Sequence, residues 1–345
     1  MFLVGEYVPW FMAPSTNGTN IELQSFGGRY VVLCFFGSAA HPFSRRVLDD
    51  IGRQSELFQR EGIVFVGISA DPRDAHLRPG WEQGTYLCDT AREVSRLYGV
   101  MSQDGTQFQQ QTIILDPMLR VASVLPFAGD MEGYVPRLLD ALHARPALQN
   151  ISGHAPIIIL PNVFEPEFCR ALIGLYEQHG GQDFGALANV DGKVVPFYDR
   201  QNKSRLDCVI KDPDILKAAF FRMGRSLIPE VQRAFQFQPA GVESPVVACY
   251  DAATGGCFKA HRDNPDPVVA YRKFAVTITL NEDYEGGGLW FPEYGSRLYR
   301  GLTGGAMVFS CTLLHEVKSV TKGRRFTYIP FLCVQKQVQD HLQGR

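Results

Sequence analysis

The pattern of apolar residues changes at a short polar segment, residues 145–153, and this change divides the chain into two differently built halves. Before the segment, continuous apolar runs alternate with stretches of helical spacing, which is typical of strands covered on both faces by helices. After it, two helical stretches precede many short strands with glycine-rich turns, which favours an antiparallel barrel or sandwich. At about 150 residues per domain, 345 residues are enough for two domains.

The first domain is expected to be an α/β unit of residues 1–146, followed by a linker at 147–154 and a second domain at 155–338. In the first domain we expect strands at residues 30–36, 63–69, 112–115 and 120–125, and helices at residues 46–61, 90–98 and 131–143. In the second domain we expect helices at residues 165–179 and 214–235, and strands between residues 245 and 334.

Composition excludes several classes of protein. With 34 Lys and Arg against 36 Asp and Glu, the net charge is −2, so nucleic acid is not an expected partner. The longest apolar runs, residues 30–37 and 155–160, are far shorter than the roughly 20 residues of a membrane helix, so we expect no membrane association. None of the eight cysteines forms a CxxC pair and no secretory signal is visible. We therefore expect reduced thiols and a cytoplasmic protein.

Two histidines and an aspartate form the most informative pattern in the second half. His261 and Asp263 are two residues apart, so on an extended strand both side chains point to one face. His315 follows near the end of a predicted strand at 306–314. Two imidazoles and one carboxylate are the facial ligand set of non-haem Fe(II), which leaves coordination positions open. The alternative is that these are ordinary polar residues satisfied in a core.

An arginine follows on a predicted strand of its own. Arg325 lies in the sequence GRRFTY at 323–328, where alternate residues project inward. A buried guanidinium is costly without an anionic partner and is suited to bidentate binding of a carboxylate.

With these residues in place, the stretch 246–331 resembles the catalytic core of the Fe(II)/2-oxoglutarate dioxygenases, in their prolyl-hydroxylase branch. The matching motifs are, in chain order, ACY at 248–250, HRDNP at 261–265, TITLN at 277–281, GGLWFP at 287–292, GGAMVF at 304–309, HEV at 315–317 and GRR at 323–325. The resemblance implies a double-stranded β-helix, that is, a jelly-roll or cupin-like α+β domain.

The resemblance also implies roles for single residues. Iron would be bound by His261, Asp263 and His315. The far carboxylate of 2-oxoglutarate would pair with Arg325, with two hydroxyl side chains, Tyr250 and Thr279, as further partners. Arg324 is the alternative to Arg325. We prefer Arg325 because the family's Gly-x-Arg pattern places the second residue after glycine inward.

The implied reaction is hydroxylation of an aliphatic C–H bond, with 2-oxoglutarate and O2 converted to succinate and CO2 and with ascorbate as an optional reductant. The substrate is expected to be a prolyl residue in a polypeptide, or a proline-like or free amino acid. Arg205, Asp207 and Trp290 are the residues that we expect at the substrate. A pocket closed by residues 189–207 would favour a small molecule, whereas an open groove would favour a peptide.

Residues 1–146 resemble the peroxiredoxin branch of the thioredoxin fold, from the order of their elements and from landmarks such as GISAD at 67–71. At the turn where that family carries its peroxidatic cysteine, this chain has Ser44. His41 stands for the family's threonine and Gln110 for its arginine. A serine is not a thiolate nucleophile near neutral pH, so this domain is expected to be redox-inactive. It would serve as a scaffold, a homodimerisation unit or a surface for a partner protein.

Two alternatives belong to other functional classes. One is a redox enzyme or sensor built on the thioredoxin-like half, which predicts peroxide or thiol turnover. The other is a non-catalytic interaction protein with a vestigial barrel, which predicts neither iron binding nor decarboxylation of 2-oxoglutarate.

Overall fold

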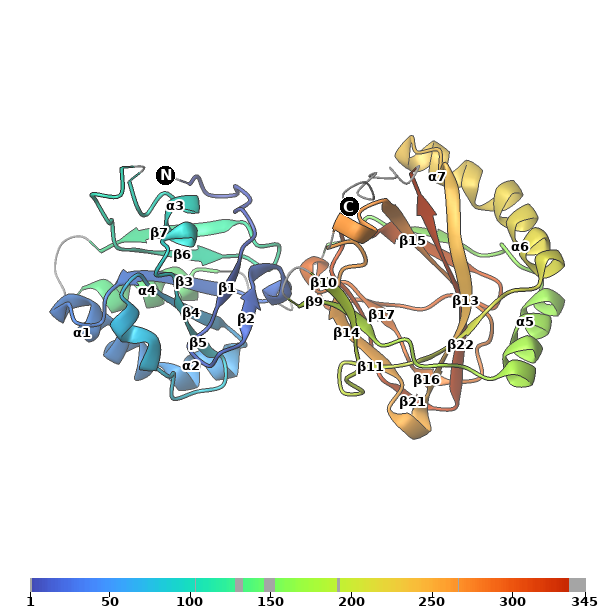
Figure 1. Ribbon diagram of the computed structural model, residues 1–345, viewed down its shortest axis with the longest axis horizontal. Helices are drawn as coiled ribbons and strands as arrows, with labels where there is room; N and C mark the ends of the chain where they lie inside the picture. The colour runs from blue at the N-terminus through green and yellow to red at the C-terminus, as the bar shows by residue number, and fades with distance from the viewer. Residues whose placement is uncertain are drawn as a thin grey trace, which may run out of the picture. The chain divides into compact units, whose positions relative to one another are not determined.

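In the computed structural model of the protein, the described residues are 2–102, 104–127, 133–145, 153–190, 193–265 and 267–334. The chain divides into two compact units, which Figure 1 draws in blue to green and in green to red. Unit 1 comprises Met1–Gly153 and Pro292–Ser296, and unit 2 comprises His154–Phe291 and Arg297–Arg345. Of the expected linker at 147–154, all but the last two residues lie outside the described residues, as do residues 335–338 at the end of the expected second domain.

Unit 1 is built on a five-stranded sheet in the order β5-β4-β3-β6-β7. Its strands are β3 (Val31–Gly37), β4 (Val64–Ser69), β5 (Gly84–Cys88), β6 (Gln111–Leu115) and β7 (Val121–Pro126). Strand β4 pairs in parallel with β3 and β5, whereas β6 pairs antiparallel with β3 and β7. This mixed sheet with helices on its faces is the thioredoxin-like α/β arrangement.

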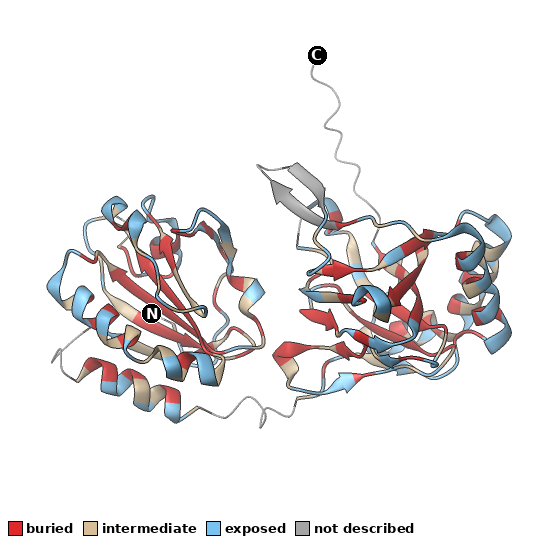
Figure 2. Cartoon of the chain, turned by 90° about the horizontal axis from the view of Figure 1, so that it is seen from below, coloured by how far each residue is buried: buried red, intermediate tan, exposed pale blue. Residues whose placement is uncertain are grey.

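Both faces of the sheet in unit 1 are covered because β3 is apolar on both sides. Val32 and Phe36 pack into one hydrophobic cluster with residues of α1, α2 and α4, and Leu33 and Phe35 pack into a second cluster with residues of α3. The helices are α1 (Pro42–Gly52), α2 (Ser55–Glu61), α3 (Glu93–Leu97) and α4 (Tyr134–His143). Figure 2 shows the central strands of this unit as buried and the outer sides of its helices as exposed.

Shorter elements complete unit 1. They are the hairpin of β1 (Met12–Pro14) and β2 (Asn20–Glu22) and the 3-10 helices η1 (Leu23–Phe26), η2 (Pro72–His76) and η6 (Pro292–Tyr294). The helix expected over residues 46–61 is wrong in one respect, because the structure has two helices there. Helix α1 ends at Gly52, and glycine is a poor helix former. Of the helix expected at 131–143, the first two residues lie outside the described residues.

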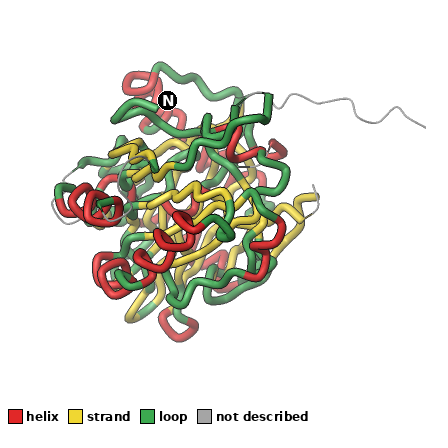
Figure 3. Tube along the Cα trace, turned by 90° about the vertical axis from the view of Figure 1, so that its left-hand side faces the viewer, coloured by secondary structure: helices red, strands yellow, loops and turns green. Residues whose placement is uncertain are grey.

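Unit 2 contains two larger sheets in which every pairing is antiparallel. The six-stranded sheet has the order β12-β13-β22-β15-β19-β8, with strands β12 (Leu206–Val209), β13 (Gly241–Asp251), β22 (Arg324–Cys333), β15 (Arg272–Thr279), β19 (Ala306–Ser310) and β8 (Ile158–Leu160). The five-stranded sheet has the order β11-β14-β20-β17-β18, with strands β11 (Lys203–Ser204), β14 (Cys257–His261), β20 (His315–Val317), β17 (Leu289–Trp290) and β18 (Leu298–Tyr299). Figure 3 draws the strands of the chain in yellow and its helices in red.

Smaller elements of unit 2 are the hairpin of β9 (Ala186–Val190) and β10 (Lys193–Phe197), the pair β16 (Glu285–Gly286) and β21 (Val320–Lys322), and the 3-10 helices η4 (Ala252–Thr254) and η5 (Pro267–Val269). Three helices, α5 (Pro166–His179), α6 (Pro213–Ser226) and α7 (Ile228–Phe235), lie beside the six-stranded sheet (Figure 1). The single helix expected over 214–235 is therefore wrong. It breaks at Leu227, because the ring of Pro229 would clash with the carbonyl four residues earlier in a continuous helix.

The six-stranded sheet separates an apolar core from a polar interior. Cys249 and Phe326 are cross-strand partners and belong to the core cluster that includes residues of the three helices. Their neighbours Tyr250 and Arg325 are also cross-strand partners, and side-chain alternation places them on the opposite face. The helices therefore stabilise one face of the sheet and leave the other face free to carry polar groups.

Candidate metal centre

His261, Asp263 and His315 lie together in unit 2, and each offers one ligand atom to a group in which these atoms all lie within 4.8 Å of one another. His261 is the last residue of β14 and His315 the first residue of β20, and the two are cross-strand partners. The Asp263 oxygens lie 3.6 Å from Nε2 of His261 and 3.5 Å from Nε2 of His315. Both separations are shorter than twice a metal–ligand bond of about 2.1 Å, so one ion fits between each histidine and the carboxylate.

One sequence expectation about this cluster is wrong. His315 was expected at the end of a strand over 306–314, but β19 ends at Ser310 and His315 begins β20 in the other sheet. The chain crosses from one sheet to the other between these strands. That crossing brings His315 opposite His261.

Backbone carbonyls fix which nitrogen of each imidazole faces the centre. Nδ1 of His261 lies 2.7 Å from the carbonyl oxygen of Lys259, and Nδ1 of His315 lies 3.0 Å from that of Leu313. A carbonyl only accepts, so in both rings Nδ1 carries the hydrogen and the neutral ring presents the lone pair of Nε2. This orientation of ligating histidines by a second hydrogen bond is typical of metal sites.

The pKa values of His315 and Asp263 are both lowered. Burial, outweighing the nearby Asp263 carboxylate, lowers the pKa of His315 to about 4. Burial acts to raise the pKa of Asp263, but its contacts with His315 and His261 outweigh burial and lower that pKa to about 2. At neutral pH a carboxylate therefore faces a neutral imidazole lone pair, an arrangement that a bound cation stabilises.

Aromatic rings surround the histidines. The ring of Phe258 stacks on His261 with centroids 3.5 Å apart, and Phe309 meets His315 edge-on at 4.7 Å. Phe291, which is fully buried, packs on Phe309. These rings fix the imidazoles and exclude water from their sides.

Arg325 has the properties of an anion-binding group. Its side chain is 3% exposed, it forms no ion pair with any described residue, and its Nη1 has no hydrogen-bond partner there. Thr327, two residues later on the same face, and its cross-strand partner Thr279 each have a buried hydroxyl that likewise has no described partner. A buried guanidinium beside two unpartnered hydroxyls is suited to a carboxylate ligand.

The neighbours of Arg325 distinguish it from Arg324. The Tyr250 ring lies 5.0 Å from the Arg325 guanidinium, whereas Arg324 is 45% exposed and forms an ion pair with Glu177 at 2.7 Å. Gly287, at a positive φ of 63°, lies against Arg325, and a Cβ there would come within 2.9 Å of the arginine Cδ. A larger residue at this position would displace the guanidinium.

The three residues expected at the substrate divide into two groups. Arg205 and Asp207 form an ion pair at 2.7 Å, and Nη1 of Arg205 lies 3.4 Å from the hydroxyl of Tyr250. Trp290 pairs with Glu316, the residue after His315, so alternation places it on the other face of the sheet, where Nζ of Lys318 lies 3.7 Å from its ring. The structure therefore brings Arg205 and Asp207 beside Tyr250 and does not bring Trp290 there.

Lys203 is the residue in this region that we did not predict. It is 7% exposed, and its Nζ lies 3.9 Å from Asp207 and 5.4 Å from the ring of Phe258. The sequence did contain an indication of it. Residues 203, 205 and 207 are all charged and two residues apart, so on a strand their side chains share one face. The segment 189–207, expected to close the pocket, includes residues 191 and 192, which lie outside the described residues.

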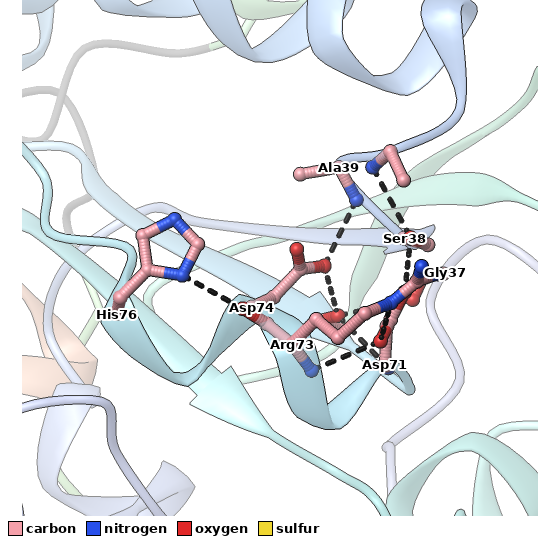
Figure 4. A network of polar contacts seen from close by, with 9 residues as sticks. Gly37, Ser38, Ala39, Asp71, Arg73, Asp74 and His76 are labelled. Atoms are coloured by element: carbon pink, nitrogen blue, oxygen red, sulfur yellow. Dashed lines mark hydrogen bonds and ion pairs between the residues drawn. The ribbon is translucent and has the colours of Figure 1, made fainter.

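In unit 1, the turn after β3 is held by two carboxylates (Figure 4). Ser38 Oγ donates to Asp71 at 2.6 Å, and Asp74 accepts from the Ala39 amide at 2.9 Å and from Ser69 Oγ at 2.6 Å. Together these contacts join the ends of β3 and β4. They leave the carboxylates paired within the turn rather than directed to a ligand.

Ser44 lies in the first turn of α1, the helix that follows this turn, and is completely buried. Its hydroxyl donates to the carbonyl of Phe36 at 2.8 Å, and Nε2 of Gln110 donates to Ser44 at 2.7 Å. Burial raises the pKa of Cys34 to about 12, and burial also raises the pKa of Cys88. Unit 1 has no further cysteine, so none of its side chains is a thiolate at neutral pH.

Comparison with known proteins divides the chain in the same way. The AhpC/TSA family matches residues 4–124. A solved structure, the peroxidoxin BcpB from Mycobacterium tuberculosis, is 22% identical over 42% of this chain and 99% of that one, with a TM-score of 0.38. The C-terminal part is similar to proteins named PKHD-type hydroxylase. One, from Saccharophagus degradans, is 34% identical over 30% of this chain and 47% of its own length. Another, from Stutzerimonas stutzeri, is 27% identical over 54% and 81%.

The chain spans about half the length of the first curated relatives that it matches. No helix among the described residues is long and apolar enough to cross a membrane. All eight cysteines are free.

Proposed function

We propose that unit 2 is an Fe(II)- and 2-oxoglutarate-dependent dioxygenase that hydroxylates an aliphatic C–H bond, and that its two antiparallel sheets form a jelly-roll. The observation that carries this proposal is the convergence of Nε2 of His261, Nε2 of His315 and the Asp263 carboxylate within reach of a single ion. This donor set fits non-haem Fe(II) and leaves coordination positions open. The similarity of the C-terminal part to PKHD-type hydroxylases supports the same class.

In this proposal each residue of the candidate site has a definite role. His261, Asp263 and His315 hold the metal. Arg325 binds the far carboxylate of 2-oxoglutarate, and the buried hydroxyl of Thr279 completes the site. When bound, Fe(II) supplies the oxidative chemistry that converts 2-oxoglutarate and O2 to succinate and CO2 and inserts one oxygen atom into the substrate. The surrounding aromatic rings keep water from this reaction.

The substrate belongs to the same proposal in general form: a prolyl residue in a polypeptide, or a proline-like or free amino acid. Arg205 and Asp207, beside Tyr250, are the residues that face it. Ascorbate is proposed as an optional reductant of the metal, and the cytoplasm as the compartment.

Anaerobic titration tests the proposal directly. Addition of Fe(II) and then 2-oxoglutarate to the metal-free protein is expected to produce a weak visible metal-to-ligand charge-transfer band, and admission of O2 is expected to release succinate slowly without added substrate. Amino acids or peptides that accelerate succinate release identify the substrate. A folded protein that binds Fe(II) but gives neither band nor succinate would show instead that the barrel is vestigial.

For unit 1 we propose a redox-inactive domain that supports unit 2 or binds a partner, either a second copy or another protein. This proposal rests on Ser44, which stands at the position where the resemblance places a peroxidatic cysteine. Ser44 is buried and hydrogen-bonded to Gln110. Similarity to the AhpC/TSA family favours a peroxidase as the second candidate.

Thiol titration separates these two candidates for unit 1. At pH 8, a thiol with a pKa of about 12, such as Cys34, is a thiolate in only about one molecule in 10,000. Seven of the eight cysteines are buried, and only Cys88 is partly exposed. We therefore expect at most one thiol of the native protein to react with Ellman's reagent within minutes, and eight after denaturation. Hydrogen peroxide should not be consumed faster than in buffer with thiol reductant. A rapid peroxide turnover that is lost in Cys34→Ser or Cys88→Ser would establish the peroxidase instead.

A further inference from the structure

A buried group of charges lies beside the candidate metal centre and is not balanced. Lys203, Arg205 and Asp207 alternate along the segment that contains β11 and β12, with side chains 7%, 15% and 4% exposed. Lys203 pairs across the strands with Phe258, and Asp207 pairs with Ala248 of β13. These three residues, here called the charged triad, form part of the wall between the two sheets.

The charged triad contains two cations and one anion. Arg205 and Lys203 approach the same oxygen of Asp207, Oδ2, at 2.7 Å and 3.9 Å. Nζ of Lys203 also donates to the carbonyl oxygen of Gly185, whereas Nε of Arg205 and Oδ1 of Asp207 have no hydrogen-bond partner among the described residues. Burial, followed by the charge of Arg205, lowers the pKa of Lys203 to about 8, although the carboxylates of Asp207 and Asp183 act to raise it. An excess positive charge of this kind is costly in a protein interior unless an anion offsets it.

The charged triad lies next to both parts of the proposed active site. The Arg205 guanidinium lies 5.6 Å from the ring of Phe258, which stacks on the metal-ligand candidate His261. The same guanidinium approaches the hydroxyl of Tyr250, whose ring lies 5.0 Å from the guanidinium of Arg325. The charged triad is therefore connected through Phe258 to His261 and through Tyr250 to Arg325.

The proposed cosubstrate does not offset this charge. Fe(II) with two neutral histidines and one carboxylate carries one positive charge, and Arg325 carries another. The two carboxylates of 2-oxoglutarate neutralise these two charges. The excess charge of Lys203 and Arg205 over Asp207 is opposed in part by Asp183, a partly exposed carboxylate that acts on Lys203, and the rest is left for a further anion.

We propose that the substrate carries a free carboxylate that Lys203 and Arg205 bind. This inference rests on the proposed dioxygenase function and narrows its substrate class. A free amino acid supplies the carboxylate, and so does a peptide whose C-terminus lies close to the oxidised carbon. An internal prolyl residue does not, because its flanking peptide groups are neutral.

Acid and amide pairs test the proposal with a readout other than turnover. The anaerobic Fe(II)–2-oxoglutarate complex is titrated with each of the twenty amino acids and its carboxamide, and with acetyl-Gly-Gly-Pro and its C-terminal amide, while the visible band is followed. We expect at least one acid to perturb the band with an affinity about 10-fold or more above that of its amide, as for a hydrogen bond to a charged group. Preference for a free amino acid or for the peptide acid distinguishes the two sources.

Lys203→Met is the decisive variant, because methionine matches the length of the stem on Phe258 and removes the excess charge. In Lys203→Met, the preference for acids over amides is expected to fall to about 3-fold or less. Arg205→Gln is also expected to weaken the binding of acids. Lys322→Met is the matched control, since Lys322 is 75% exposed and pairs with Glu285. Lys203→Met also loses the hydrogen bond from Nζ to the Gly185 carbonyl, so a lower Tm in this variant would not bear on carboxylate binding, and the acid preference is the deciding readout.

The outcomes separate this inference from the proposed function. If Fe(II) and 2-oxoglutarate give no band, the dioxygenase proposal fails. If the band forms but no acid perturbs it, or acids bind no better than amides, or Lys203→Met retains the preference for acids, only the carboxylate proposal is wrong.

Discussion

Alanine in place of His315 is expected to weaken Fe(II) binding by about 100-fold or more and to abolish succinate formation. Loss of a residue that only orients a metal ligand costs 10- to 100-fold in affinity, so loss of the ligand itself should cost at least as much. His315 is 5% exposed, and no other described histidine, cysteine or carboxylate joins the group that could replace it. The measurement is anaerobic Fe(II) titration of the metal-free variant, followed by the visible band with 2-oxoglutarate.

His179→Ala is the matched control for this variant. The Nδ1 of His179 also contacts a backbone carbonyl, that of Leu175, but the residue is exposed on α5 and belongs to no group of metal-ligand spacing among the described residues. It should bind Fe(II) as the unaltered protein does. Equal Fe(II) affinity in the His315 variant, in protein with an unchanged circular dichroism spectrum, would refute the ligand assignment.

Glutamine in place of Arg325 is expected to weaken 2-oxoglutarate binding by about 30-fold or more, with little effect on Fe(II) affinity. Removing one partner of a buried charge pair typically costs at least about 2 kcal/mol, which corresponds to this factor. Because Arg325 has no anionic partner among the described residues, the substitution should not lower Tm when 2-oxoglutarate is absent. Stabilisation by added 2-oxoglutarate should be reduced in the same variant.

Arg324→Gln provides the comparison on the neighbouring residue. Its guanidinium is 45% exposed and pairs with Glu177, so this variant loses an exposed ion pair worth little and should keep its 2-oxoglutarate affinity. If Arg324→Gln raised the KM for 2-oxoglutarate while Arg325→Gln did not, the roles of the two arginines would be reversed.

Local sequence predicted most elements of unit 1 because their signals are local. The apolar run expected at 30–36 forms β3 (Val31–Gly37), and the run expected at 63–69 forms β4 (Val64–Ser69). Strand β5 (Gly84–Cys88) was not predicted, because only its middle residues are buried and its five residues offer little periodicity. Its place at the edge of the sheet depends on pairing with β4, which no short stretch of sequence encodes.

In unit 2, the sequence showed which residue types carry chemistry but not which of them meet. The spacing of His261 and Asp263 follows from strand alternation, whereas the approach of His315 depends on pairing between β14 and β20. The same holds for Lys203, whose burial follows from the pairing of β11 with β14 and from its contact with Phe258. A charged residue at a spacing of two from other charges is equally compatible with an exposed strand face, so the sequence could not place it.

The sequence by itself determined that the chain has two halves with different patterns of apolar residues. It also determined which side chains could bind a metal, which could bind a carboxylate, and which are thiols. It did so because periodicity and residue chemistry are properties of neighbours in the chain. Only the tertiary structure decided that Arg325 rather than Arg324 is buried with no ion-pair partner among the described residues, that Trp290 lies on the face of the sheet opposite to His315, and that Lys203 shares one carboxylate with Arg205. Burial and charge balance depend on contacts between distant strands, and those contacts exist only once the sheets have formed.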